Sequence, residues 1–168
     1  MKITFTIPGA PVAKQRPKFA RMGNFVRTYT PKETVSYEGL VRYAASQAMQ
    51  GHEPIEGAIW LLVEIALPIP QSTSKKRQAM MAQGVIPHTK KPDGDNVLKA
   101  IKDACNGVVW RDDSQVVDGR YTKRYSVTPG VQVTVTCEQL ALLLQQADAP
   151  PLEATLGLFL KTATATPF

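Results

Sequence analysis

The sequence has few cysteines and no long hydrophobic run. Its 168 residues include two cysteines, Cys105 and Cys137, too few to build a disulfide framework. No uninterrupted apolar stretch approaches the ~20 residues that a membrane-spanning helix needs, and no internal repeat or low-complexity tract is found. The N-terminal segment alternates like a strand and lacks the apolar core of a signal peptide. We therefore expect a cytoplasmic protein with reduced thiols in its core and no membrane contact.

The composition is that of a globular domain with basic charge gathered at one end. Hydrophobic residues make up 43% of the chain and charged residues 20%, which suits a packed core. The net charge is +6, and residues 1–43 alone carry eight Lys and Arg against two Asp and Glu. The N-terminal quarter thus accounts for the whole excess. A clustered basic region suggests a polyanionic partner, although a solvated surface would have the same composition.

The hydrophobic pattern predicts an α+β (mixed α/β) fold with a single mixed β-sheet and helices packed against it. Strands are predicted at residues 2–7, 58–67, 115–123 and 131–137, and helices at 32–49, 72–83 and 94–106.

Two further segments need separate interpretations. The basic stretch 12–30 suits a loop or hairpin arm, with a short strand at 25–29. Thr30 is predicted to cap the helix that follows, with Pro31 at its first position. Residues 138–168 change in character and contain one short amphipathic stretch. We expect a domain at residues 1–137 and a C-terminal extension, residues 138–168, of unknown role.

The candidate site is a set of acidic residues around the predicted helix 94–106. Asp93 and Asp95 stand two residues apart at its start, and Lys99 follows Asp95 by one turn on the same face. Asp112 and Asp113 lie in a turn just before the next strand. If that turn folds back toward the helix start, three carboxylates converge. A hard cation such as Mg²⁺ would relieve their repulsion and supports phosphodiester hydrolysis.

Each element of this set also has an ordinary structural explanation. An aspartate at a helix start commonly caps the helix, and Lys99 could pair with Asp95 at the i, i+4 spacing. Asp112 and Asp113 could serve only to form the turn.

Four spaced motifs carry a more specific signal than any single residue. These are IPGAPVAKQRP (7–17), YTPKETVSYE (29–38), HTKKPDGDNVLKAIKDACNG (88–107) and WRDDSQVVD (110–118). In order and spacing the chain resembles the RusA family of Holliday-junction resolvases, in the longer form common in phages and prophages. The resemblance covers about residues 2–136.

The resemblance implies a Mg²⁺-dependent endonuclease, with Mn²⁺ as a substitute metal, that works as a homodimer on branched DNA. Such enzymes cut two strands of like polarity across a four-way junction in recombination or repair. The family's catalytic, metal-binding acids correspond to Asp93, Asp95 and Asp113, and its essential lysine corresponds to Lys99. Asn96 and Asp112 would support these ligands without binding the metal. Gly94 departs from the bulky apolar residue that is more common in the family, and we expect it to loosen the helix start.

Basic residues supply the expected DNA contacts. The leading candidates are Lys14, Arg16, Lys18 and Arg21, followed by Arg27, Lys75, Lys76 and Arg77. Phe19 or Phe25 could wedge into the junction centre. We interpret His88, a lone loop histidine, as a structural hydrogen-bonding residue.

Three alternatives remain open at this point. A non-catalytic DNA-binding module could keep the fold, and a general branched-DNA or flap nuclease could share the chemistry. A nucleotide-sugar transferase also uses a D-x-D motif, but such enzymes need a nucleotide-binding domain that this chain does not offer.

Overall fold

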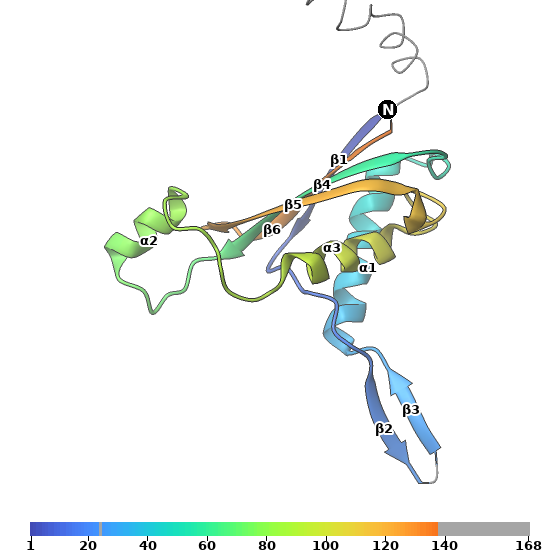
Figure 1. Cartoon of the computed structure of the whole chain (residues 1–168), viewed down its shortest axis with the longest axis horizontal. Helices are drawn as coiled ribbons and strands as arrows, with labels where there is room; N and C mark the ends of the chain where they lie inside the picture. Colours follow the sequence, from blue (N-terminus) through green and yellow to red (C-terminus); the bar gives the residue numbers. More distant parts are fainter. Residues whose placement is uncertain (24, 138–168) are drawn as a thin grey trace, which may run out of the picture. The chain divides into compact units, whose positions relative to one another are not determined.

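The computed structural model describes residues 1–23 and 25–137, which contain six strands, three α-helices and one short 3₁₀ helix (Figure 1). In chain order they are β1 (Lys2–Pro8), β2 (Lys18–Met22), β3 (Phe25–Tyr29), α1 (Lys32–Met49), β4 (Ile59–Pro68), α2 (Lys75–Ala82), α3 (Gly94–Cys105), η1 (Asp113–Gln115), β5 (Val116–Ser126) and β6 (Gly130–Thr136). The predicted extension, with its short amphipathic stretch, lies outside the described residues. None of the described helices has the length and hydrophobicity to cross a membrane.

Four strands form one mixed sheet in the order β1-β6-β4-β5. β6 pairs antiparallel with both β1 and β4, whereas β4 and β5 run parallel. Parallel neighbours need a crossover connection, and here the segment between β4 and β5 contains α2 and α3. The α+β fold with one mixed sheet and packed helices is therefore confirmed.

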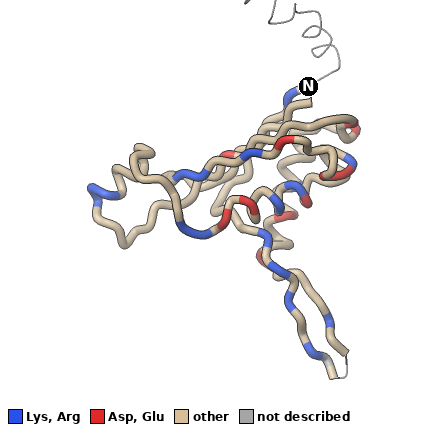
Figure 2. The backbone as a smooth tube through the Cα atoms, in the orientation of Figure 1, with Lys and Arg blue, Asp and Glu red and all other residues tan. Residues whose placement is uncertain are grey.

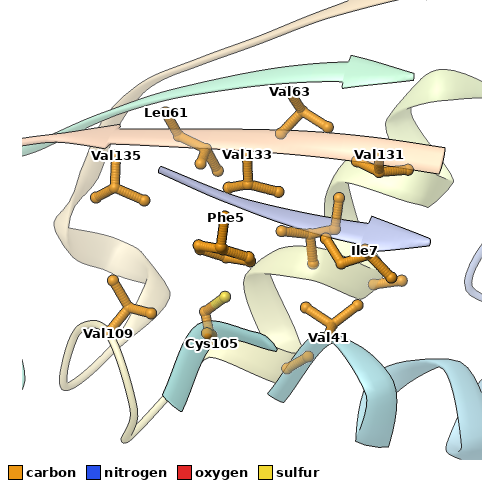
Figure 3. Packing of buried hydrophobic residues seen from close by; sticks show 14 of the residues in the cluster. Phe5, Ile7, Val41, Leu61, Val63, Cys105, Val109, Val131, Val133 and Val135 are labelled. Carbon is orange, nitrogen blue, oxygen red and sulfur yellow. The ribbon is translucent and has the colours of Figure 1, made fainter. Parts of the chain in front are cut away.

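The core lies between one face of this sheet and the helices α1 and α3 (Figure 3). Strand alternation decides which side chains enter it, since every second residue points to the same face. Ile3, Phe5 and Ile7 of β1 are buried while their sequence neighbours in β1 are exposed. Burial also raises the pKa of the Cys105 thiol of α3 to about 12, which agrees with the expected core thiol.

The predicted element boundaries hold within a few residues, with one correction at α1. Pro31, rather than Thr30, occupies the position just before the helix, and no side chain caps it. α1 ends at Met49 and is followed by Gln50 and Gly51, both with positive φ, a conformation that commonly terminates a helix. β5 continues to Ser126, three residues beyond the predicted end at Lys123.

β2 and β3 form a separate two-stranded hairpin between β1 and α1. Its described side chains are nearly all exposed, including Phe19 and Phe25, which are 74% and 80% exposed. Lys and Arg lie along both of its strands (Figure 2). The hairpin-arm interpretation of this basic segment is thus confirmed, and we call β2 and β3 together the basic arm.

Candidate active site

The start of α3 presents two acidic side chains to solvent. α3 is strongly amphipathic, so Val97, Ala100 and Ile101 enter the core while Asp93 and Asp95 are exposed. Asp93 occupies the N-cap position, yet its side chain makes no capping hydrogen bond. The Asp93 carboxylate therefore does not cap α3. Negative charge at a helix N-terminus is also favoured by the helix dipole.

The inner face of β5 lies against the segment that leads into α3. Lys123 donates hydrogen bonds from Nζ to the carbonyl oxygens of Lys90 and Pro92, both at 2.9 Å. Tyr125 packs against His88 with ring centroids 4.5 Å apart. These contacts hold the loop that carries Asp93, so β5 positions the start of α3.

His88 is accounted for by this packing. Partial burial, followed by the nearby charge of Lys123, lowers the pKa of His88 below its usual value. Its ring packs against the Tyr125 ring at an interplanar angle of 52°. The contact with Tyr125 gives His88 a packing role. The expected hydrogen-bonding role is not confirmed, because the buried Nδ1 atom has no hydrogen-bond partner among the described residues.

Gly94 has a steric explanation that the sequence did not reveal. The Tyr121 ring of β5 lies directly over Gly94, and a Cβ atom at residue 94 would fall 2.5 Å from the Cδ2 and Cζ atoms of that ring. Real Cβ atoms do not approach other atoms so closely, so any larger residue would displace Tyr121. An aromatic ring from the neighbouring strand therefore fills the space that a side chain at residue 94 would take. That glycine loosens the helix start stays a prediction.

The turn that carries Asp112 and Asp113 is held rigidly. Asp112 accepts a hydrogen bond from the Ser114 backbone N–H at 2.9 Å. Hydrogen bonds from the side chain and the backbone of Ser114 lower the pKa of the Asp112 carboxyl. The Gln115 side chain accepts from the Asp112 N–H and donates to the carbonyl oxygens of Ile55 and Gly57. Asp112 is thus occupied as the cap of η1, which suits a supporting role and not a ligand role.

Asp113 does not join the acidic pair. Its carboxylate forms an ion pair with Lys102 at 3.5 Å, two turns along α3 from the Asp93 end. Within residues 1–23 and 25–137, no three Asp, Glu, His or Cys side chains are grouped closely enough to hold a metal ion together. The predicted convergence of three carboxylates is therefore absent from this structure. The acidic centre consists of Asp93 and Asp95.

Lys99 is exposed on the same side of α3 as Asp95. Among the ion pairs of the described residues, none links Lys99 to Asp95, so the ordinary i, i+4 pairing does not account for it. Its ammonium group is available one turn from the acidic pair.

The N-terminal segment that leads to the basic arm joins α3 beside the acidic pair. The Lys14 backbone N–H donates to the Asn96 carbonyl oxygen at 2.9 Å, and Gln15 donates to Glu33 at 3.3 Å. An open cavity of about 500 Å³ lies at this junction. Its polar lining residues are Gln15, Glu33, Lys91, Asp93 and Asn96.

Lys14 was predicted to contact DNA, but its side chain is bound within the protein. Its ammonium group forms ion pairs with Asp103 of α3 and with Glu38 of α1, the latter at 3.2 Å. Burial alone would lower the pKa of Lys14, but the hydrogen bonds to Asp103 and Glu38 outweigh it and raise the pKa. Lys14 therefore ties the N-terminal segment to both helices, and its assignment as a leading DNA contact is corrected.

We expect Lys14→Ala to lower the free energy of unfolding by about 1–2 kcal/mol, because two carboxylates lose a charged partner that is partly buried. Arg16→Ala is the matched control, since Arg16 is exposed and should stay within about 0.5 kcal/mol of the parent. Urea denaturation of both variants measures the difference. Equal stabilities would show that the Lys14 ion pairs do not hold the segment.

The other predicted basic residues are exposed. Four lie in the segment that forms the basic arm and leads to it, and three lie in the first turn of α2: Arg16, Lys18, Arg21, Arg27, Lys75, Lys76 and Arg77.

Sequence reasoning missed the residues that surround the acidic pair. Tyr121 and Lys123 come from β5, and the exposed Lys90 and Lys91 directly precede the pair. The lysines could have been found from their proximity in sequence. The β5 residues could not, because their approach depends on the parallel pairing of β4 with β5.

Comparison with known proteins identifies the family of the chain. The family model described as endodeoxyribonuclease RusA matches residues 8–136. The Bacillus subtilis (strain 168) protein YqaN, itself uncharacterized, is 37% identical over 138 residues, which cover 79% of this chain and 94% of YqaN. The matched region includes the basic arm, the acidic pair, and the turn of Asp112 and Asp113. The chain therefore belongs to the RusA family of endodeoxyribonucleases and is a nuclease by family.

Proposed function

We propose that this chain is a divalent-metal-dependent endodeoxyribonuclease that resolves four-way DNA junctions as a homodimer in the cytoplasm. The observation that carries the proposal is the exposed pair Asp93 and Asp95 at the N-terminus of α3, beside the root of the basic arm. This arrangement combines an anionic site for a cation with a cationic path for DNA. Family membership supplies the reaction class.

The acidic pair fits a hard divalent cation. Mg²⁺ commonly binds through one or two carboxylates, with waters and substrate phosphates completing its shell, so a third protein acid is not required. Asp93 has no capping bond to give up, and both carboxylates are exposed. We propose Asp93 and Asp95 as the ligands of Mg²⁺, or of Mn²⁺ as a substitute. When bound, such an ion polarises a phosphoryl oxygen and activates water.

Asp113 and Lys99 are the two further residues of the proposed chemistry. To act as a third ligand, the Asp113 carboxylate would have to leave its ion pair with Lys102 and bind the cation. Lys99 would stabilise the negative charge that develops on the phosphate during attack. Asn96 lines the adjacent cavity and would orient the scissile strand there.

The basic arm is proposed to hold the junction. An isolated two-stranded hairpin is marginally stable in water, so an exposed arm of this kind benefits from a partner. Its Lys18, Arg21 and Arg27 provide phosphate contacts, and Phe19 and Phe25 could stack on or wedge between bases. The cluster Lys75, Lys76 and Arg77 on α2 would contact a second arm of the DNA.

A homodimer suits the symmetry of the substrate. One acidic centre hydrolyses one phosphodiester at a time, whereas a four-way junction needs two matched incisions. A two-fold pair of chains supplies two identical centres.

The test compares cleavage of a four-way junction, a flap substrate and a linear duplex with Mg²⁺ present. We expect paired nicks in the junction and at least about 10-fold slower cutting of the linear duplex. Equal rates on all three substrates would favour a general branched-DNA or flap nuclease. Tight junction binding without any nicking, in Mg²⁺ or Mn²⁺, would favour a non-catalytic DNA-binding module.

A further inference from the structure

The basic arm is joined to the rest of the fold by two connections of different kinds. β3 is followed directly by α1, so the chain itself holds one end of the arm to that helix. The other end continues from β1 through the segment 9–17, which reaches α3 only through non-covalent contacts. Figure 1 shows the arm extending from the start of α1, away from the sheet. Because α3 carries the acidic pair, these contacts contribute directly to where the arm lies relative to that pair.

Lys14 of this segment contacts α3 at two points. Its backbone N–H donates to the carbonyl oxygen of Asn96 at 2.9 Å, and Asn96 directly follows Asp95. Its ammonium group forms an ion pair with Asp103, further along the helix. Asn96 and Asp103 are separated by about two helical turns, so they lie on nearly the same side of α3. Two contacts on one side fix both the position and the direction of Lys14 along the helix.

The same ammonium group also binds α1. It lies 3.2 Å from the carboxylate of Glu38. The side chains of Lys14, Glu38 and Asp103 are 30%, 26% and 25% exposed, so water and salt screen these ion pairs less than pairs on an open surface. We call these three residues the Lys14 bridge. The bridge connects the helix that continues from the arm with the helix that carries the acidic pair.

The basic residues that follow the bridge are placed differently. Arg16 and Lys18 are exposed, and neither belongs to an ion pair among the described residues. Within a few residues the chain therefore passes from a lysine bound between two helices to cations that face solvent. This division separates an anchor of the arm from the residues that are available to contact phosphate.

We propose that Lys14 is a positioning residue that sets the register between DNA bound on the basic arm and the acidic pair, by bridging α1 and α3 at the root of the arm. This inference rests on the proposed function of the arm and of the acidic pair. Cleavage requires that the scissile phosphate lies within reach of the site, and a misplacement of about 1 Å can cost about 100-fold in rate. Loss of the bridge should therefore impair cleavage more than DNA binding.

The first test follows cleavage by the full chain under single-turnover conditions, with Mg²⁺ and an end-labelled four-way junction. Lys14→Met keeps the length of the side chain and removes its charge. We expect the cleavage rate to fall about 10-fold and the nicks to spread over neighbouring phosphodiesters, while the dissociation constant in EDTA stays within about 2-fold of the parent. The assay is run at a temperature at which circular dichroism shows the variant folded. A loss of stability alone would lower the amount of active protein without moving the nicks.

Asp103→Asn breaks the same bridge from the other side and makes the chain more positive. We expect it to spread the nicks as Lys14→Met does, although the two variants change the net charge in opposite directions. If Lys14 instead contacted DNA, Asp103→Asn would release it for binding and leave the nick positions unchanged, whereas Lys14→Met would weaken binding and lower the salt slope by about one. That result would overturn the inference.

Lys2→Met is the matched control for the loss of charge. It removes an exposed positive charge at the start of β1, outside the root of the arm. Its cleavage rate and nick positions should equal those of the parent. A similar spread of nicks in Lys2→Met would show that net charge, and not the bridge, controls the register.

The second test needs neither metal nor DNA. Asp103→Asn leaves the sequence of the segment 9–17 unchanged, so hydrogen–deuterium exchange of the same peptide can be compared between the variant and the parent. We expect the backbone amides of this segment to exchange about 10-fold faster in the variant, with the strands of the sheet unchanged. Equal exchange would overturn the inference, because the bridge would then not hold the segment.

The outcomes also separate this inference from the proposed function. If the parent nicks the junction at fixed positions, and Lys14→Met and Asp103→Asn do the same at the rate of the parent, the positioning role fails and the proposed function stands. If the parent does not nick the junction in Mg²⁺ or Mn²⁺, the proposed function itself fails, and the positioning role fails with it.

Discussion

Asp95→Asn is expected to reduce junction cleavage by more than about 100-fold, while the protein still binds the junction. Loss of a residue that only supports a metal ligand typically costs about 10- to 100-fold, and loss of the ligand itself should cost more. Asparagine has nearly the same shape and stays exposed at the second position of α3, so folding should be preserved. Removing one negative charge also eases the repulsion between this site and phosphate. Junction affinity should therefore be unchanged or tighter.

The measurement pairs a Mg²⁺ cleavage assay with a binding assay in EDTA on the same junction. Glu53→Gln is the control, because it removes an exposed acid in the connection between α1 and β4, outside the proposed site. Cleavage by Asp95→Asn within a few-fold of the parent would exclude Asp95 as a ligand. Loss of folding together with binding would instead assign Asp95 a structural role.

Removal of the three basic side chains of the arm is expected to produce the largest loss of DNA binding. The test uses one triple variant that carries Lys18→Ala, Arg21→Ala and Arg27→Ala. In it, the slope of the logarithm of the binding constant against the logarithm of the salt concentration should decrease in magnitude by about three, because each phosphate contact contributes about 0.9. These residues lie on a hairpin whose described side chains are nearly all exposed, so the sheet and helices should keep their stability. Fluorescence anisotropy of a labelled junction across a salt series measures this slope.

A triple alanine variant of Lys75, Lys76 and Arg77 removes the same charge from α2 and is the matched comparison. We expect it to change the slope less. A larger change from the α2 variant would move the main DNA path from the arm to α2. No change from either variant would place the DNA on another surface, such as the exposed Lys90 and Lys91 beside the acidic pair.

Two expectations about the site changed because charged groups found partners on other elements of the fold. Lys14 was expected at the DNA, yet it is bound by Asp103, 89 residues away, and by Glu38. Asp113 was expected beside Asp93 and Asp95, but the turn that carries it packs against the later part of α3, where Lys102 meets it. Neither pairing follows from a local pattern, because each depends on how two separate elements pack.

The sequence by itself determined the alternation of β1, the amphipathic character of α3 and the exposure of Asp93, Asp95 and Lys99 on it. These features follow from residue periods of 2 and 3.6, which are local properties of the chain. Only the tertiary structure decided which groups accompany the acidic pair. Tyr121 reaches Gly94 because β5 lies parallel to β4 in one particular register, and a shift of one residue would turn Tyr121 to the opposite face of the sheet.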